Sequence, residues 1–421
     1  MSTVIHNAPS CADDREPGVL SVHDARARLL ARIAPLTGGE RLALREALGR
    51  VLAGDVVSPI DVPGHTNSAM DGFALRFADL AEDDFTELRV VGTALAGQPY
   101  PGTVGAGECV RIMTGAPLPA GADTVVMQER VRDHGERVVV GTGHRPGQNV
   151  RRAGEDLARG QTALPAGKRL TPADLGLLAS LGQAEVTVLR RPRVAFFSTG
   201  DELRGLGEPL GEGEVYDSNR YTLYGMLRRA GVELRDLGVV PDDLDALRAA
   251  FAEAARHADL VITSGGVSVG EADYTKQVLD ELGEVSFWKI AMKPGRPLTF
   301  GRLGDAWFFG LPGNPVAVMV TFYQFVLPAL HRLAGDTQWQ PLVLPATLTE
   351  PLRKRPGRAE FARGILATGP DGTLQVRSTG AQGSGILSSM SHGNCFILLD
   401  EEQGSLDAGA TVRVQPFAGF V

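Results

Sequence analysis

Cysteine, net positive charge and long apolar runs are the features in which this 421-residue chain is poorest. Its three cysteines, Cys11, Cys109 and Cys395, lie far apart without Cys-x-x-Cys spacing, which argues against a disulfide framework and against a zinc site. The formal net charge of −8 argues against a global basic surface for nucleic acid, so any anion must be bound locally. The N-terminus has no apolar signal core, and no apolar run elsewhere approaches the roughly eighteen residues of a membrane span. These absences predict a soluble, cytoplasmic protein that binds neither nucleic acid nor membrane, with a disordered N-terminus over residues 1–20.

Glycine and proline are abundant, at 52 and 26 residues, which is typical of a chain with many turns and a large β component. The length predicts roughly two to four domains. Helical patterns occupy residues 22–33, roughly 42–52 and 172–181, and a strand pattern occupies 184–189. Short apolar runs between glycine and proline turns predict strands at 88–91, 109–113, 124–128 and 137–140. We therefore expect an N-terminal mixed domain, residues 21–57 and 151–190, interrupted by an inserted β domain, residues 58–150.

Residues 191–335 have the alternating pattern of an α/β domain. Strand patterns lie at 194–197, 233–240, 260–262 and 307–310, and helical patterns lie at 218–230, 242–258, 272–282 and 315–334. This alternation predicts a parallel sheet with helices on its faces. Residues 340–421 return to strands and turns, which predicts a C-terminal β domain.

The most informative stretch of this α/β domain runs from residue 260 to residue 282. A short β-branched strand leads through the small residues Ser264, Gly265 and Gly266 to a helical pattern. Glycines at the end of a strand let backbone N–H groups approach a phosphate, although most such pairs only make turns. Asp273 either caps the following helix or holds the Mg²⁺ that accompanies such phosphates.

Polar clusters follow all four predicted parallel strands, and ligands of such sheets bind at the carboxyl ends of the strands. Each cluster alone is an ordinary turn or helix cap, but four on one edge indicate a site. Glu202, Asp242 and Asp273 offer the hard oxygen ligands that Mg²⁺ prefers. Lys289 and Lys293 are either solvated surface lysines or cations that face an anionic ligand.

Seven motifs, taken together and in order, resemble the molybdopterin molybdenumtransferase family, whose members are bacterial MoeA and the E domain of gephyrin. They are Asn67-Ser-Ala-Met-Asp-Gly-Phe-Ala74, Arg111-Ile-Met-Thr-Gly-Ala116, Arg152-Ala-Gly-Glu-Asp156, Ser198-Thr-Gly-Asp-Glu-Leu203, Ser264-Gly-Gly-Val-Ser-Val-Gly-Glu-Ala-Asp273, Lys293-Pro-Gly and Leu311-Pro-Gly-Asn-Pro315. The resemblance runs from about residue 21 to the C-terminus. One departure is Phe73, where many members have tyrosine.

The resemblance implies a homodimer of four-domain subunits, with a molybdopterin-binding α/β domain, a C-terminal β-barrel-like domain and a site shared between subunits. The implied reaction takes adenylylated molybdopterin and molybdate, releases AMP with the help of Mg²⁺, and leaves the metal on the dithiolene. The upstream molybdopterin adenylyltransferase is the implied partner. Carried over position by position, the catalytic residues are Asp71, Thr114, Asp156, Glu202, Asp242 and Asp273, with Glu202, Asp242 and Asp273 as metal ligands. The substrate-binding residues are Ser264, Gly265, Gly266, Lys289, Lys293, Asn314, Arg363 and Ser384.

Three other functions are alternatives to this one. A molybdopterin adenylyltransferase shares the α/β fold but is usually a single small domain with a Gly-Gly-Thr-Gly type of loop. A gephyrin-like scaffold module would carry a fused second α/β domain or a long linker. A Rossmann dehydrogenase would show G-x-G-x-x-G after the strand at 194–197. The sequence favours the enzyme, without separating molybdate from tungstate.

Overall fold

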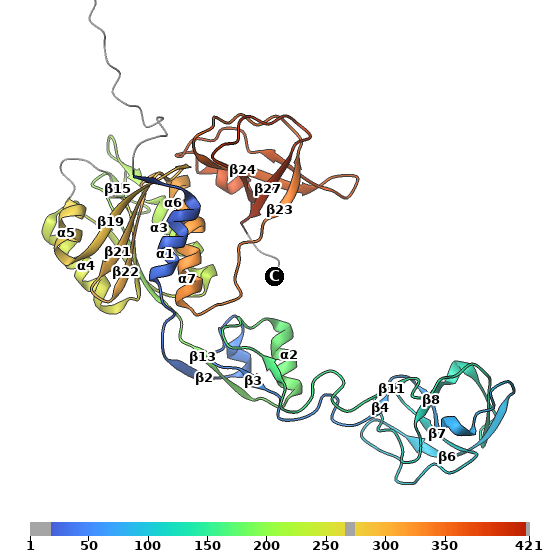
Figure 1. Cartoon of the computed structure of the whole chain (residues 1–421). Helices are drawn as coiled ribbons and strands as arrows, with labels where there is room; N and C mark the ends of the chain where they lie inside the picture. The colour runs from blue at the N-terminus through green and yellow to red at the C-terminus, as the bar shows by residue number, and fades with distance from the viewer. Residues whose placement is uncertain (1–17, 266–273, 418–421) are drawn as a thin grey trace, which may run out of the picture. The chain divides into compact units, whose positions relative to one another are not determined.

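The computed structural model describes residues 18–265 and 274–417. The chain divides into two compact units, one of residues 1–40, 49–51 and 189–421, and one of residues 41–48 and 52–188, called unit 1 and unit 2 below. Figure 1 shows their elements, coloured along the chain.

A seven-stranded mixed sheet forms the centre of unit 1, in the order β1-β19-β21-β22-β18-β14-β17. Its strands are β1 (Val19–Leu20), β14 (Arg193–Thr199), β17 (Glu233–Val240), β18 (Leu260–Ser264), β19 (Gly283–Ile290), β21 (Pro297–Leu303) and β22 (Ala306–Leu311). The predicted parallel arrangement of β17, β14, β18 and β22 is confirmed. The antiparallel pairs β19–β21 and β21–β22 were not predicted, because polar residues such as Glu284 and Ser286 interrupt the apolar pattern of β19.

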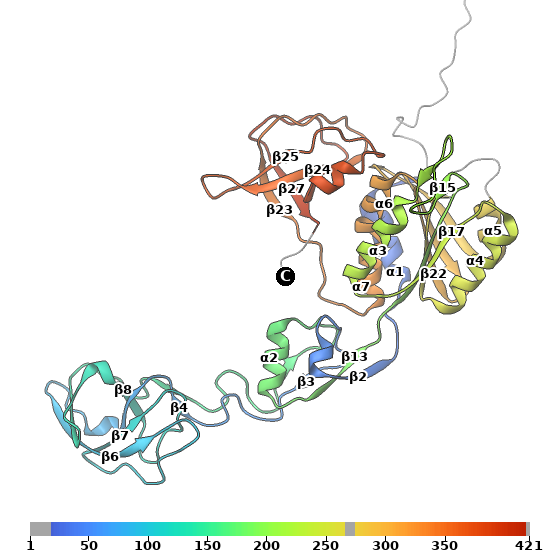
Figure 2. The same cartoon turned by 180° about the vertical axis from the view of Figure 1, so that it is seen from behind.

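Helices cover both faces of this sheet (Figures 1 and 2). One face carries α1 (Val22–Arg32), α3 (Ser218–Ala230) and a long helical run made of α6 (Pro315–Thr321), the π-helical turn η4 (Phe322–Val326) and α7 (Leu327–Leu333). The other carries α4 (Leu244–His257) and α5 (Tyr274–Leu282). Phe196 packs in the first core and Phe197 in the second, as expected of a strand buried on both sides.

Two predictions about the N-terminal part of the chain are corrected here. Helix α1 was assigned to the N-terminal mixed domain, but Ala25 and Leu29 are fully buried in the largest core of unit 1. The apolar stripe of α1 packs in this core, which has more buried apolar residues than the core clusters of unit 2. Disorder was predicted up to residue 20, yet β1 pairs with β19 in parallel. Residues 1–17 of that segment lie outside the described residues.

One apolar helical run is longer than the sequence predicted. The run Pro315–Leu333 has the length and composition of a membrane span, but 72% of its apolar window is buried inside the structure. A helix that is apolar on all sides is also what the core of a large domain requires. Its burial in the core of unit 1 accounts for its composition.

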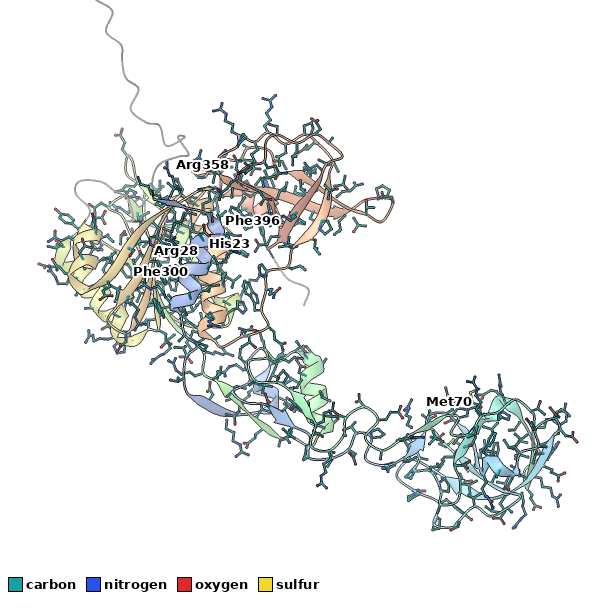
Figure 3. All side chains as sticks on the ribbon, in the orientation of Figure 1. His23, Arg28, Met70, Phe300, Arg358 and Phe396 are labelled. Atoms are coloured by element: carbon teal, nitrogen blue, oxygen red, sulfur yellow. The ribbon has the colours of Figure 1, made fainter. Side chains whose placement is uncertain are left out.

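The C-terminal part of unit 1 is a closed barrel of five strands, β24-β25-β23-β27-β26, with β26 pairing back to β24. The strands are β23 (Leu344–Leu348), β24 (Ala359–Thr368), β25 (Leu374–Ser378), β26 (Cys395–Leu399) and β27 (Thr411–Pro416); helix α8 (Ser388–His392) precedes β26. The short strand β20 (Met292–Lys293) extends this sheet by pairing with β24. Phe361 and Phe396 pack in the core of the α/β part, so the barrel is joined to it by apolar contact as well. Phe396 is labelled in Figure 3.

Unit 2 contains a small mixed part and a β part. The mixed part has β2 (Gly39–Ala43), η1 (Leu44–Ala47), β3 (Val56–Val57), β12 (Thr162–Leu164), α2 (Pro172–Ser180) and β13 (Glu185–Leu189). The predicted helix over 42–52 is wrong: these residues continue β2, which pairs with β13, and then make one 3₁₀ turn that stops before Gly49 at φ 72°. Pairing with a strand more than 140 residues away overrides the local helical pattern.

The β part of unit 2 is a six-stranded sheet, β8-β5-β7-β6-β10-β9. Its strands are β5 (Gly72–Leu75), β6 (Thr86–Ala94), β7 (Glu108–Ile112), β8 (Thr124–Met127), β9 (Val131–Asp133) and β10 (Arg137–Val140). Strand β4 (Asn67–Ser68) precedes these strands in the sequence and β11 (Val150–Arg151) follows them, and the two form an antiparallel pair. Apolar clusters cover the two faces of the sheet.

Candidate functional site

The carboxyl ends of the parallel strands of unit 1 form one edge of the sheet. Ser198 of β14 pairs with Ser264 of β18, which pairs in turn with Leu311 of β22. The polar clusters predicted at these strand ends are therefore neighbours, and we call this place the strand-end site.

Asn219 holds the strand-end site together, and sequence reasoning missed it. Its side-chain amide donates to the hydroxyl of Ser264 at 2.9 Å and to the carbonyl oxygen of Gly313 at 2.7 Å. Asn219 lies in the first turn of α3, which Asp217 caps by accepting from the N–H of Arg220. The run Asp-Ser-Asn is an ordinary start of a helix, so the sequence carries no separate signal for this bridge.

The backbone of Gly265 is part of the sheet edge. Its N–H donates to the carbonyl oxygen of Leu311 at 3.2 Å, so this amide extends the sheet and is not a free phosphate donor. The residue has φ 91°, and a Cβ there would lie 2.4 Å from the carbonyl oxygen of Thr199. Glycine is therefore required for the close approach of β18 to β14. Gly266, the second glycine of the predicted cradle, lies outside the described residues.

Several buried side-chain oxygens at this edge have no hydrogen-bond partner among the described residues. They are the hydroxyls of Ser198, Thr199 and Thr263, one carboxylate oxygen of Asp217 and the amide oxygen of Asn219. Buried polar atoms are usually paired, and a group of unpaired ones marks a place for water, an ion or a ligand. The strand-end site thus has the polar lining that a bound ligand needs.

The carboxylates expected to bind Mg²⁺ lie at the same edge. Glu202 and Asp242 are exposed, on the loops that follow β14 and β17. The N–H of Asp242 donates to a carboxylate oxygen of Asp201 at 3.2 Å, which joins the two loops. Within residues 18–265 and 274–417 no three acidic, histidine or cysteine side chains form a metal cluster. Asp273, the third predicted ligand, lies outside those residues.

This donor set fits Mg²⁺. The ion binds through one or two carboxylates together with waters and substrate phosphates, so it does not need a closed cage of protein ligands. Glu202 and Asp242 carry carboxylate oxygens of this kind, and the unpaired oxygens at the same edge offer further polar contacts.

Ser384 and Asn314 come from distant parts of the chain and meet at the start of α6. The N–H of Val316 donates to the carbonyl oxygen of Ser384 at 3.0 Å, and Asn314 is the N-cap position of α6. The carbonyl oxygen of Gly313 accepts a hydrogen bond from Asn219, and Gly313 directly precedes Asn314. The structure therefore brings Ser264, Gly265, Asn314 and Ser384 into one connected group.

Arg363 is 1% exposed and contacts the loop that carries Ser384. Its guanidinium donates to the carbonyl oxygen of Gly383 and to the hydroxyl of Ser389, both at 3.0 Å. Burial lowers its pKa to about 10. Because Gly383 directly precedes Ser384, we interpret Arg363 as a positioning residue for that loop.

Lys289 and Lys293 lie apart from Ser264. Both are exposed, at or just after the end of β19, which is three strands from β18 in the sheet order. The ammonium of Lys293 lies 3.4 Å from a carboxylate oxygen of Glu360. Lys293 thus lies at the junction with the barrel.

A second polar cluster lies in unit 2. The backbone N–H and the hydroxyl of Thr114 both donate to one carboxylate oxygen of Asp71, at 2.7 and 2.8 Å. These bonds lower the pKa of Asp71, the backbone bond most strongly. A Cβ on Gly72 would lie 2.0 Å from the carbonyl oxygen of Val126, so the strand that follows Asp71 is tightly packed. Asp71 is thereby held as a carboxylate beside the exposed side chain of Met70 (Figure 3).

The loop that carries Asp156 converges on the same part of unit 2. The N–H of Asp156 donates to the carbonyl oxygen of Val62, and the N–H of Gly154 donates to the carbonyl oxygen of Pro63. The backbone of Ser68 exchanges hydrogen bonds with Ala116 and Gly115. The side chains of Asp71 and Thr114 are thus in direct contact, and the Asp156 loop is bonded to residues 62 and 63, upstream of Asp71 in the chain.

Comparison with known proteins places these features in one family. Three family models match the chain: the MoeA N-terminal region (domain I and II) over residues 20–182, a probable molybdopterin binding domain over 195–332, and the MoeA C-terminal region (domain IV) over 345–417. A molybdopterin molybdenumtransferase of Haemophilus influenzae is 46% identical over 401 residues, covering 95% of this chain and 99% of that protein. One from a Nostoc species is 38% identical, covering 89% and 88%.

A solved structure shows the same architecture. The crystal structure of the molybdopterin biosynthesis moeA protein from Pyrococcus horikoshii is 30% identical with a TM-score of 0.83, covering 95% of this chain and all of that one. The order of the matched regions and the identity over nearly the whole length agree with this likeness. The chain therefore belongs to the molybdopterin molybdenumtransferase family.

Proposed function

We propose that this protein is a molybdopterin molybdenumtransferase, which inserts molybdenum from molybdate into molybdopterin during molybdenum cofactor biosynthesis. The observation that carries the proposal is the 46% identity to an enzyme of that name over nearly the whole of both chains. The strand-end site supports it, because its polar lining and its carboxylates suit an anionic, phosphate-bearing substrate with a divalent cation.

In finer detail, we propose that the substrate is adenylylated molybdopterin and that turnover releases AMP. Asn219 and Ser264 hold the two loops that would enclose the phosphoanhydride, and the unpaired hydroxyls of Ser198 and Thr199 are available as donors. Glu202 and Asp242, with Asp273, would hold Mg²⁺. When bound, that ion would offset the charge of the phosphates at the bond that breaks.

Arg363 and Asp71 would have two further roles, one in positioning a loop and one as a carboxylate. Arg363 keeps the Ser384 loop against the start of α6. Asp71, held ionised by Thr114, supplies a carboxylate that can accept a proton or orient water.

We also propose that the protein acts as a cytoplasmic homodimer, supplied with substrate by a molybdopterin adenylyltransferase. This adenylyltransferase is the main alternative to the proposed activity. The whole-length match to molybdenumtransferases, including the barrel and unit 2, favours the insertion step.

The test is a reconstituted reaction with adenylylated molybdopterin, Mg²⁺ and molybdate, in which AMP and active cofactor are both measured. Both products are expected, and a parallel reaction with tungstate determines the metal preference. Formation of neither product by folded protein would contradict the proposed function. Consumption of ATP to adenylylate molybdopterin would favour the alternative.

A further inference from the structure

The long helical run of unit 1 changes to the π-helical turn η4 where it contacts the barrel. All five residues of η4 are buried, and helix α1 lies beside this run (Figure 1). Turns of this kind are rare and occur frequently at functional sites. Two successive side chains of η4, those of Tyr323 and Gln324, make hydrogen bonds to the C-terminal end of the barrel.

Gln324 is the middle member of a buried polar chain that runs from α1 to the barrel. The guanidinium of Arg26 donates to the carbonyl oxygen of Gln324 at 2.9 Å and also to its side-chain oxygen. The side-chain amide of Gln324 donates to the side-chain oxygen of Gln415, in β27, at 2.8 Å. Gln324 and Gln415 are 3% and 6% exposed. We call Arg26, Gln324 and Gln415 the buried link.

The sequence explains why the carbonyl oxygen of Gln324 is available to Arg26. In a regular helix this oxygen would accept from the N–H of residue 328, which is proline and has none. Arg26 supplies the missing donor. Within the part of the chain that the structure describes, Arg26 has no acidic partner, and burial lowers its pKa. Because a buried cation depends on its hydrogen-bond acceptors, Arg26 and Gln324 hold each other in place.

The barrel is attached to the same helical run at a second place. The N–H of Val316, at the start of α6, donates to the carbonyl oxygen of Ser384. The eight residues from Val316 to Gln324 correspond to roughly 12 Å along a helix. A single attachment would leave the barrel free to rotate on the helix, whereas two attachments at this separation fix its orientation.

Packing alone does not fix this joint. A cavity of about 520 Å³ borders all three side chains of the buried link. Closely packed interiors contain few voids larger than a water molecule, so specific hydrogen bonds carry more of the geometry here. The neighbouring Tyr323 adds an apolar contact, since its ring packs against Phe396 and Phe417.

We propose that Gln324 is a positioning residue, which fixes the orientation of the barrel on the helical run and thereby keeps the Ser384 loop at the start of α6. That loop meets Asn314, which follows the Gly313 that accepts from Asn219 of the strand-end site. Without the buried link the barrel turns about its remaining attachments, and the Ser384 loop leaves this place. The effect on turnover rests on the proposed function, whereas the effect on the joint does not.

Hydrogen–deuterium exchange of the intact protein, followed by mass spectrometry, tests the role of Gln324. Gln324→Met keeps an unbranched side chain and removes both of its side-chain hydrogen bonds. Exchange at the start of α6 is expected to become about tenfold faster, because the bond from Val316 to Ser384 opens more often, while exchange in β18 stays unchanged. Gln415→Met, which leaves Arg26 its acceptors, is expected to give the same change from the barrel side.

Two further variants separate positioning from general loss of stability. Gln324→Glu is expected to restore the slow exchange, because a carboxylate accepts from Arg26 and from the amide group of Gln415. Phe251→Leu, in the core on the other face of the sheet, is the matched control and leaves exchange at the start of α6 unchanged. The kcat/KM for AMP release is expected to fall about tenfold in Gln324→Met and to stay near the wild-type value in Phe251→Leu.

Several results would overturn the proposal. They are unchanged exchange at the start of α6 in both methionine variants, an equal rise in β18, the same fast exchange in Gln324→Glu, and an unchanged kcat/KM despite faster exchange. Absence of turnover in the wild-type protein would contradict the proposed function instead. In that case the exchange measurements still decide whether Gln324 holds the Ser384 loop in place.

Discussion

Removal of the Asn219 side chain is the sharpest test of the strand-end site. Asn219→Ala breaks the hydrogen bonds to Ser264 and Gly313, which join the loops after β18 and β22. Helix α3 keeps its Asp217 cap and its buried residues Leu223 and Leu227, so the fold is expected to persist. The change therefore loosens the geometry of the site without removing any proposed metal ligand.

The size of the effect follows from the two bonds that are lost. A neutral hydrogen bond contributes about 0.5–1.5 kcal/mol, so the loss of two amounts to about 1–3 kcal/mol. If that energy holds the loops in the reactive arrangement, kcat/KM for AMP release falls by roughly 5- to 150-fold. The free energy of unfolding falls by no more than the same amount.

A second asparagine of unit 1 is a matched control. Asn394 also makes two hydrogen bonds, both with the backbone of Leu366 at 2.7 and 2.9 Å, but within the barrel. Asn394→Ala is expected to lower stability similarly and to leave kcat/KM near the wild-type value. Denaturant unfolding and steady-state AMP release are measured for both variants. Equal activity in the two variants would refute the bridging role of Asn219.

Three further predictions follow from the other site residues. Thr114→Val removes one donor to Asp71, so the pKa of Asp71 rises toward its ordinary value; carbon NMR titration of the carboxylate measures this, and an unchanged pKa contradicts the role of the hydroxyl. Because the folded pKa is lowered, the stabilisation from this carboxylate is present above its ordinary pKa and is lost as pH falls through the lowered value. Asp242→Asn is expected to raise the Mg²⁺ concentration needed for half-maximal AMP release, whereas an unchanged requirement would remove Asp242 from the metal site. In heterodimers of inactive Asp71→Asn and Asp273→Ala subunits, activity is expected to return if each site draws on both subunits, and its absence in verified heterodimers would reject sharing.

Much of the α/β part could be predicted from local patterns. The β-branched run at 260–262 and the apolar stripe of 218–230 correspond to β18 and α3. They could be predicted because the spacing of buried apolar residues follows the repeat of a strand or of a helix. The polar turn residues after the parallel strands indicated a candidate site at one edge of the sheet, since parallel strands place their carboxyl ends on one edge.

The tertiary structure alone decided the rest, and in each case a distant partner was responsible. Residues 42–52 have a helical pattern, yet pairing with β13 makes their first part a strand. Asn219 lies in an ordinary helix start, but the loops after β18 and β22 make it a bridge. The pairing of β20 with β24 places Lys293 opposite Glu360, more than sixty residues further along the chain. Periodicity and turn chemistry report only the local backbone and its burial, whereas these contacts depend on which segments fold against each other.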